Sequence, residues 1–74
     1  MSAEIESLFK KAYQLQQHNR LPQAISLYEQ IIKQDPKHIE ALHMVGLAYA
    51  QLNDMEQALI YLSKAVSLYP DDAV

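Results

Sequence analysis

The sequence predicts an all-helical protein built from two consecutive helical hairpins. Half of its 74 residues are hydrophobic, glycine occurs once and cysteine is absent, a composition typical of a small helical domain. Apolar residues recur every three or four positions along most of the chain, which is the spacing of one face of an α-helix. The third observation is an internal repeat of 34 residues, which divides the chain into residues 5–38 and residues 39–72.

Four helices follow from the apolar stripes and from the polar residues that interrupt them. In the first repeat one stripe stops at His18, and the next resumes at Leu21. The second repeat shows the same interruption at Asn53 and Asp54. The predicted helices are residues 3–18, 21–34, 37–52 and 55–69.

Residues at the helix ends support these boundaries. Asn19 and Asn53 stand where a left-handed residue closes the first helix of each repeat, a conformation that asparagine tolerates better than most residues. Asp54 is expected to cap the fourth helix. Pro36 and Pro70 end the second helix of each repeat, because proline cannot continue a helix, and proline also suits the first turn of the helix that follows.

The two repeats also match residue by residue. Identical pairs are Ile5/Ile39, Glu6/Glu40, Leu8/Leu42, Gln17/Gln51, Asn19/Asn53, Gln23/Gln57, Ala24/Ala58 and Pro36/Pro70. Small residues recur at Ala12/Gly46 and at Ala24/Ala58. They allow the two helices of a hairpin to approach each other closely.

These positions resemble the tetratricopeptide repeat, a 34-residue helical hairpin, over residues 5–72. The residues that carry the resemblance are Leu8, Ala12, Leu15, Ala24, Tyr28, Ile31 and Pro36 in the first repeat and Leu42, Gly46, Tyr49, Ala58, Leu62, Ala65 and Pro70 in the second. Departures are asparagine in place of glycine at the turn, and Lys11 where an apolar residue is usual. The resemblance implies one domain over residues 1–74, an α–α superhelix with right-handed stacking. A generic four-helix bundle is the alternative, but it gives no reason for the recurrence.

The two ends of such an array differ in polarity. The first helix carries a polar stripe of Ser7, Lys11, Gln14 and His18, whose counterparts in the second repeat are the apolar residues Ala41, Val45, Ala48 and Leu52. In a stacked array this face meets the preceding repeat. The second repeat therefore has a predecessor, and the first repeat is expected to begin the array.

The fourth helix carries an apolar stripe that no later helix of the chain covers. This predicted assembly face consists of Leu59, Leu62, Val66 and Tyr69, and its counterparts Ile25, Tyr28 and Ile32 are expected to cover the second repeat. A third repeat in this register would begin at Ala73. We expect the N-terminal part of a longer array or protein, or a homodimer that pairs through this face. The alternative is a two-hairpin monomer in which this apolar face is partly exposed to solvent.

The resemblance places a peptide-binding groove on the first helix of each repeat, along the concave side. The groove residues are Glu6, Phe9, Lys10, Tyr13, Gln17, Glu40, His43, Met44, Leu47 and Gln51. Large apolar side chains among them suit an amphipathic helix or an extended peptide, although Phe9 or Leu47 can instead pack within a hairpin. Some family members hold a C-terminal carboxylate with Lys and Asn side chains. Phe9, Tyr13 and Met44 stand at those positions here, which favours an apolar or mixed peptide.

Catalytic and cofactor sites find little support in the sequence. Glu40 and His43 form a single Glu-x-x-His, whereas di-iron helical proteins need two such motifs and two further carboxylates. A single glycine excludes a glycine-rich phosphate loop. We therefore predict no enzyme activity, no cofactor and no bound metal.

Net charge and hydropathy limit the classes of partner that the chain is expected to bind. The net charge is −3, and residues 39–74 carry five acidic groups and one basic group, which disfavours nucleic-acid binding. The longest apolar run, residues 44–50, is far too short to span a membrane. We predict a cytoplasmic interaction scaffold that binds a protein or peptide. The alternative function is the N-terminal regulatory or substrate-recruiting segment of a larger enzyme.

Overall fold

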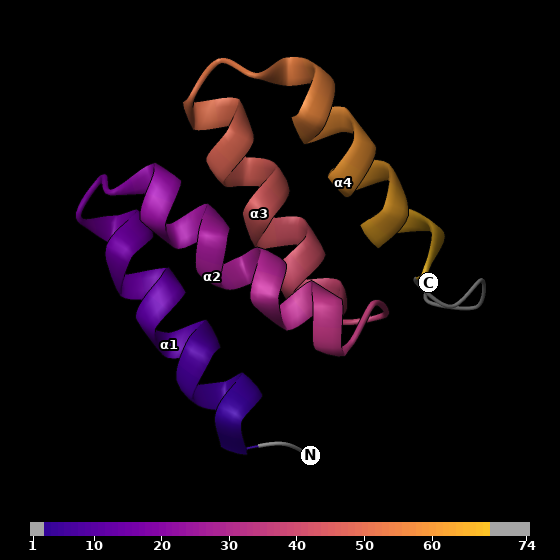
Figure 1. The fold of residues 1–74 in the computed structure, drawn as a ribbon. Helices are drawn as coiled ribbons and strands as arrows, with labels where there is room; N and C mark the ends of the chain where they lie inside the picture. The colour runs from indigo at the N-terminus through magenta and orange to yellow at the C-terminus, as the bar shows by residue number, and fades with distance from the viewer. Residues whose placement is uncertain (1–2, 69–74) are drawn as a thin grey trace.

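The computed structural model describes residues 3–68, which form four helices and no strand. The helices are α1 (Ala3–Gln17), α2 (Leu21–Gln34), α3 (Ile39–Gln51) and α4 (Met55–Ser67), and Figure 1 shows them as two hairpins that stand side by side. Each helix packs against the next one along the chain, and α1 also contacts α3. The predicted all-α fold is confirmed.

The turns inside the two hairpins are nearly identical. Asn19 has a φ of 62° and Asn53 a φ of 66°, both in the left-handed region. The following backbone N–H groups, of Arg20 and Asp54, donate to carbonyl oxygens five residues earlier, at 2.8 and 2.9 Å. This is the closing bond of a helix that ends on a left-handed residue. The role predicted for the two asparagines is confirmed.

The start of α3 differs from the prediction by two residues. The chain turns through residues 35–38, and the helix begins at Ile39 instead of residue 37. His38 is the N-cap, because its Nδ1 accepts a hydrogen bond from the backbone N–H of Ala41 at 3.0 Å. Histidine is not among the residues usually preferred at this position, so the sequence did not reveal the cap. At α4 the predicted cap is confirmed, since Asp54 Oδ1 accepts from the N–H of Gln57 at 3.3 Å.

The hydrophobic core lies where the second helix of the first hairpin meets the second hairpin. Tyr28 and Ile31 of α2 are fully buried, and so are Ala41, Val45 and Ala48 of α3. The corresponding polar stripe of α1 is exposed, as predicted. Within the apolar stripe of α3, Leu52 is the exception, because it follows the end of the helix and remains exposed.

Close packing inside the second hairpin explains its single glycine. A Cβ atom on Gly46 would lie 2.7 Å from Cγ of Leu62, so the side chain of Leu62 occupies the space that a larger residue would need. Leu62 is therefore half-buried against α3. Leu62, predicted at the centre of the assembly face, thus packs partly within its own hairpin, and its part in an assembly face stays a prediction.

Candidate functional site

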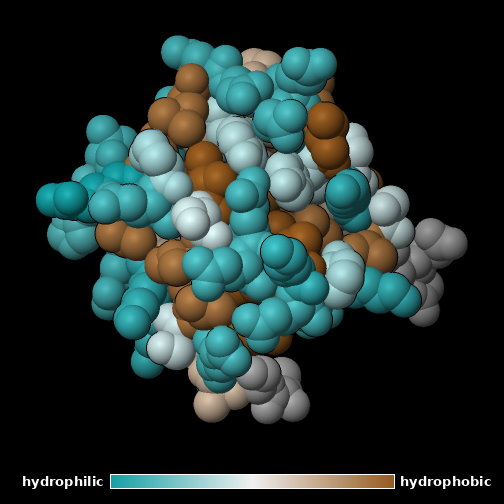
Figure 2. Space-filling view, in the orientation of Figure 1, coloured by the Kyte–Doolittle hydropathy of each residue, from teal (hydrophilic) through white to brown (hydrophobic). Residues whose placement is uncertain are grey.

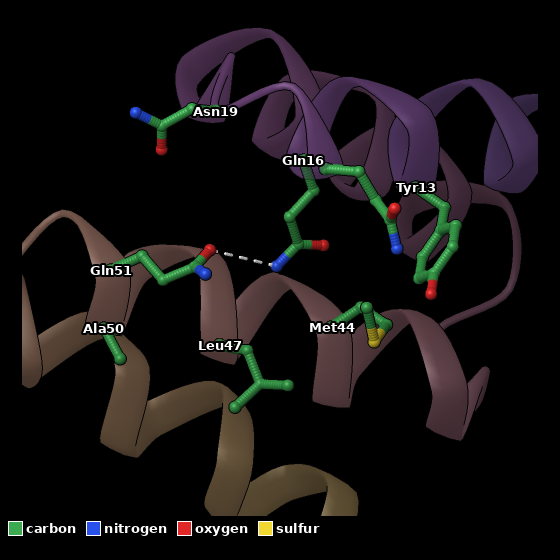
Figure 3. Close-up of a pocket in the computed structure, with 8 residues that line it drawn as sticks. Tyr13, Gln16, Asn19, Met44, Leu47, Ala50 and Gln51 are labelled. Atoms are coloured by element: carbon green, nitrogen blue, oxygen red, sulfur yellow. Dashed lines mark hydrogen bonds between the residues drawn. The ribbon is translucent and has the colours of Figure 1, made fainter.

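A hollow of about 780 Å³ lies between α1 and α3. Its volume is in the range of about 300–1,000 Å³ that is usual for ligand sites. Figure 3 shows side chains from both helices directed into it, with Gln16 and Gln51 reaching toward each other. The lining residues are Tyr13, Gln16, Gln17, Asn19, Met44, Leu47, Ala50 and Gln51.

Half of the predicted groove residues line this hollow. They are Tyr13, Gln17, Met44, Leu47 and Gln51. The other predicted residues lie outside it: Glu6, Lys10, Glu40 and His43 are exposed, and Phe9 is half-buried. All four exposed residues precede the lining residues of their own helix, so the hollow occupies the C-terminal half of each first helix.

Phe9 is half-buried and makes two aromatic contacts. Its ring meets the edge of the Tyr28 ring at 5.7 Å between centroids and stacks on the His38 ring at the same distance. It joins the residues packed against the core. The contact with Tyr28 is of the within-hairpin kind, the contact with His38 reaches the start of α3, and a part for Phe9 in the groove stays a prediction.

Three lining residues were missed by the sequence reasoning: Gln16, Asn19 and Ala50. The repeat contains a signal for one pair of them, because Gln16 and Ala50 are separated by the same 34 residues as Tyr13 and Leu47. Asn19 was assigned only its role in the turn.

A hydrogen-bond chain fixes the centre of the hollow. The hydroxyl of Tyr28 donates to Oε1 of Gln16 at 2.9 Å, and Nε2 of Gln16 donates to Oε1 of Gln51 at 3.3 Å. These contacts link α2, α1 and α3, so the amide of Gln16 is held in place by the core. Burial raises the pKa of Tyr28 to about 12.

The chemistry of the hollow is neutral and mixed. No charged residue lines it, and four of its eight lining residues carry side-chain amides, which both donate and accept hydrogen bonds. Tyr13 is 44% exposed and Leu47 is 38% exposed, high values for large apolar side chains. The hollow thus offers apolar contact beside groups that donate and accept hydrogen bonds.

Comparison with known proteins identifies the architecture. A tetratricopeptide repeat family model matches residues 9–73, most of the chain. The chain belongs to the tetratricopeptide repeat family. Its two repeats are the hairpins α1–α2 and α3–α4, and membership supports a protein-interaction role in general terms.

The tetratricopeptide repeat domain exposes apolar side chains along α4. Leu59 is 64% exposed, Val66 is 68% exposed, and Met55 lies one turn before Leu59 on the same stripe. Figure 2 shows hydrophobic side chains at the surface among hydrophilic ones over much of one side of the domain. The exposed part of the predicted assembly face is therefore Leu59 and Val66, extended by Met55. Tyr69 lies outside the described residues.

A cluster of polar and aromatic groups joins the two tetratricopeptide repeats. Oε2 of Glu29 in α2 accepts hydrogen bonds from the hydroxyls of Tyr49 at 2.8 Å and Tyr61 at 3.5 Å. The two tyrosine rings stack at 5.6 Å, and Lys64 Nζ lies 5.6 Å from the Tyr61 centroid. Burial, and then the hydrogen bond to Glu29, raise the pKa of Tyr49. This cluster was not anticipated, because its members come from three helices.

Among residues 3–68 there is no group of three or more His, Asp or Glu side chains placed to hold a metal ion. The helices in this range are also too short or too polar to cross a membrane.

Proposed function

We propose that this tetratricopeptide repeat domain is a non-catalytic interaction module that binds a segment of a partner protein between α1 and α3. The observation that carries the proposal is the pair of exposed side chains Tyr13 and Leu47, which flank Met44 in a hollow without charged groups. Exposed aromatic and apolar side chains in a concave site are the usual anchors of protein interfaces.

The partner segment is apolar or mixed in character. The amides of Gln17 and Gln51 pair with its backbone, while Tyr13, Met44 and Leu47 take its apolar side chains. A carboxylate-terminated ligand is disfavoured, because the hollow has no basic group to balance its charge. Lys10, which sequence alone placed in the groove, lies outside the hollow.

A selected peptide provides the test. Peptides are selected from a random display library on the 74-residue chain, and their affinity is measured by calorimetry for the chain and for the double variant Tyr13→Ala/Met44→Ala. We expect affinity to fall by about fivefold or more, because losing these interface anchors should together cost more than about 1 kcal/mol of binding free energy.

The control is Gln23→Ala/Gln30→Ala, which changes two exposed residues of α2 away from the hollow. It should leave both affinity and helicity unchanged. Retention of full affinity by the folded Tyr13/Met44 double variant would place the binding site elsewhere on the domain.

We also propose that Leu59 and Val66, with Met55, form a face that pairs with the same face of a second copy. These side chains are apolar and exposed, whereas the other end of the domain presents Lys11 and His18. If copies stacked head to tail, Lys11 and His18 of one copy would be buried against the apolar α4 residues of the next. Burying a charged group without a partner costs free energy. Symmetric pairing through α4 avoids that cost.

Sedimentation of the chain over a range of concentrations tests this pairing. A dimer that becomes a monomer in Leu59→Glu/Val66→Glu supports the proposal, with Ser63→Glu/Ser67→Glu on the same helix as the charge-matched control. Leu62→Glu is unsuitable as a test, because it also disrupts packing against Gly46. A well-folded monomer at high concentration would overturn self-pairing.

A further inference from the structure

A second hollow lies on the outer side of the first repeat, away from the groove between α1 and α3. Its volume is about 280 Å³, and it is lined by Lys11, Gln14, Leu15, His18, Arg20 and Leu27. This is slightly smaller than the usual ligand site of about 300–1,000 Å³, so it suits one large side chain of a partner.

The hollow combines an apolar floor with a basic rim. Leu15 and Leu27 are half-buried against the core and form the floor. Lys11, His18 and Arg20 are exposed around it, and the lining includes no acidic residue. Within residues 3–68 none of these three side chains has an ion-pair or hydrogen-bond partner. In a chain with a net charge of −3, the positive charges of Lys11 and Arg20 therefore lie at one place without a partner in the described part of the chain.

The second repeat shows what occupies the equivalent position. By the 34-residue offset, Leu15 corresponds to Tyr49 and Leu27 to Tyr61. There the helix that packs on the repeat is α2, and its Glu29 carboxylate accepts hydrogen bonds from both tyrosine hydroxyls. The same position in the first repeat is open. The domain thus contains one occupied copy of this site, and its occupant is a helix that carries an acidic side chain.

Differences between the two copies define the partner of the open one. The tyrosine floor of the second repeat, which donates hydrogen bonds, is replaced by Leu15 and Leu27, which take only apolar groups. On the rim, the basic residues of the first repeat replace uncharged or acidic residues of the second. The corresponding pairs are Lys11/Val45, His18/Leu52 and Arg20/Asp54.

We propose that this hollow is a second binding site, which takes an acidic amphipathic helix of a partner protein. A leucine-sized side chain of that helix fills the floor formed by Leu15 and Leu27. Glutamate or aspartate residues one turn before and after it pair with Lys11, His18 and Arg20. This site is independent of the groove between α1 and α3, and the two proposals fail or succeed separately.

The test uses two synthetic alanine-rich helical peptides added to the intact 74-residue chain. Each has one central leucine, flanked one turn away on both sides by glutamates in the first peptide and by glutamines in the second. Methyl resonances of Leu15 and Leu27 report occupation of the hollow, and those of Met44 and Leu47 report the groove. We expect the glutamate peptide to shift Leu15 and Leu27 and to bind about three- to tenfold more tightly than the glutamine peptide at low salt. Added salt should narrow this difference.

Variants that lack basic side chains distinguish binding at this hollow from nonspecific electrostatic attraction to the chain. In Lys11→Gln/Arg20→Gln, affinity for the glutamate peptide should fall about three- to tenfold. The control Lys33→Gln/Lys37→Gln removes the same charge from exposed positions outside the hollow and should have little effect. Equal losses in both variants, equal affinity for both peptides, or shifts confined to Met44 and Leu47 would each overturn the proposal. So would the absence of any shift at millimolar peptide.

Discussion

The second helices of the two repeats show how strongly burial depends on what packs next to a helix. Ile25 in α2 and Leu59 in α4 occupy the same repeat position, yet Ile25 is 7% exposed and Leu59 is 64% exposed. The difference arises because α3 covers α2, whereas no described helix covers the outer side of α4. Two equally hydrophobic side chains thus contribute very differently to stability.

The largest expected effect comes from truncating these two residues in turn. Ile25→Ala should lower the free energy of unfolding by about 2–5 kcal/mol, because it removes buried surface and leaves a cavity. Leu59→Ala should change it by about 0.5 kcal/mol or less, since the side chain already contacts water. Urea denaturation at low protein concentration measures both changes.

Because a small domain has little stability to lose, Ile25→Val serves as a milder companion, with an expected cost of about 0.5–1.5 kcal/mol. A cost for Leu59→Ala as large as that for Ile25→Ala would contradict the comparison. It would mean that the outer side of α4 is covered in solution.

A smaller effect is expected where the two hairpins differ in their closest contact. Gly46→Ala should destabilise the domain, since the new Cβ would lie 2.7 Å from Leu62 Cγ and overpacking costs about 1–3 kcal/mol. Better helix propensity offsets about 1 kcal/mol of this. The net loss is therefore about 0–2 kcal/mol, measured by thermal or urea unfolding.

The matched variant in the first repeat is Ala12→Gly, at the equivalent position of α1. It should cost about 1 kcal/mol through helix propensity alone. In a double-mutant cycle of Gly46→Ala with Leu62→Ala, the double variant should lose less stability than the sum of the two single variants, because the smaller side chain relieves the clash. A clear stabilisation by Gly46→Ala with Leu62 intact would refute the steric explanation of this glycine.

A comparable effect at neutral pH is expected for the hydrogen bonds between the repeats. Tyr49→Phe should cost about 0.5–1.5 kcal/mol, because it removes a 2.8 Å hydrogen bond to Glu29. Tyr61→Phe should cost less, since its bond to the same oxygen is 3.5 Å long. Urea unfolding of the two variants at pH 7 measures both costs. A larger loss of stability in Tyr61→Phe would show that Tyr61, and not Tyr49, makes the stronger hydrogen bond to Glu29.

High pH should reduce the stability that these tyrosines contribute. Burial raises the pKa of Tyr28 from 10.0 to about 12, and burial and Glu29 also raise those of Tyr49 and Tyr61. The unfolded chain loses these protons first, so the stabilisation is complete below pH 10 and decreases as pH rises toward the folded-state values. Urea midpoints measured across this range should fall, and the fall should be shallower in Tyr49→Phe. An unchanged slope in that variant would show that Tyr49 does not contribute.

Part of the candidate site was predictable from the sequence repeat. Tyr13, Met44 and Leu47 were identified because their helical positions repeat and their side chains lie away from the packing stripe of each hairpin. Phe9 shared these properties, but its ring packs against Tyr28 and His38. Periodicity indicates the side of a helix on which a residue lies, but it carries no information about the shape of neighbouring side chains.

The sequence by itself determined the local structure of this protein. Helical spacing, the left-handed asparagines and the 34-residue offset depend on residues close in the chain or on its self-similarity, so four helices and two repeats follow from them. Only the tertiary structure decided that Leu62 packs on Gly46, that Glu29 bridges two tyrosines, and that two leucines underlie a basic rim. Each of these depends on distances between side chains of different helices, which packing sets and linear spacing does not encode.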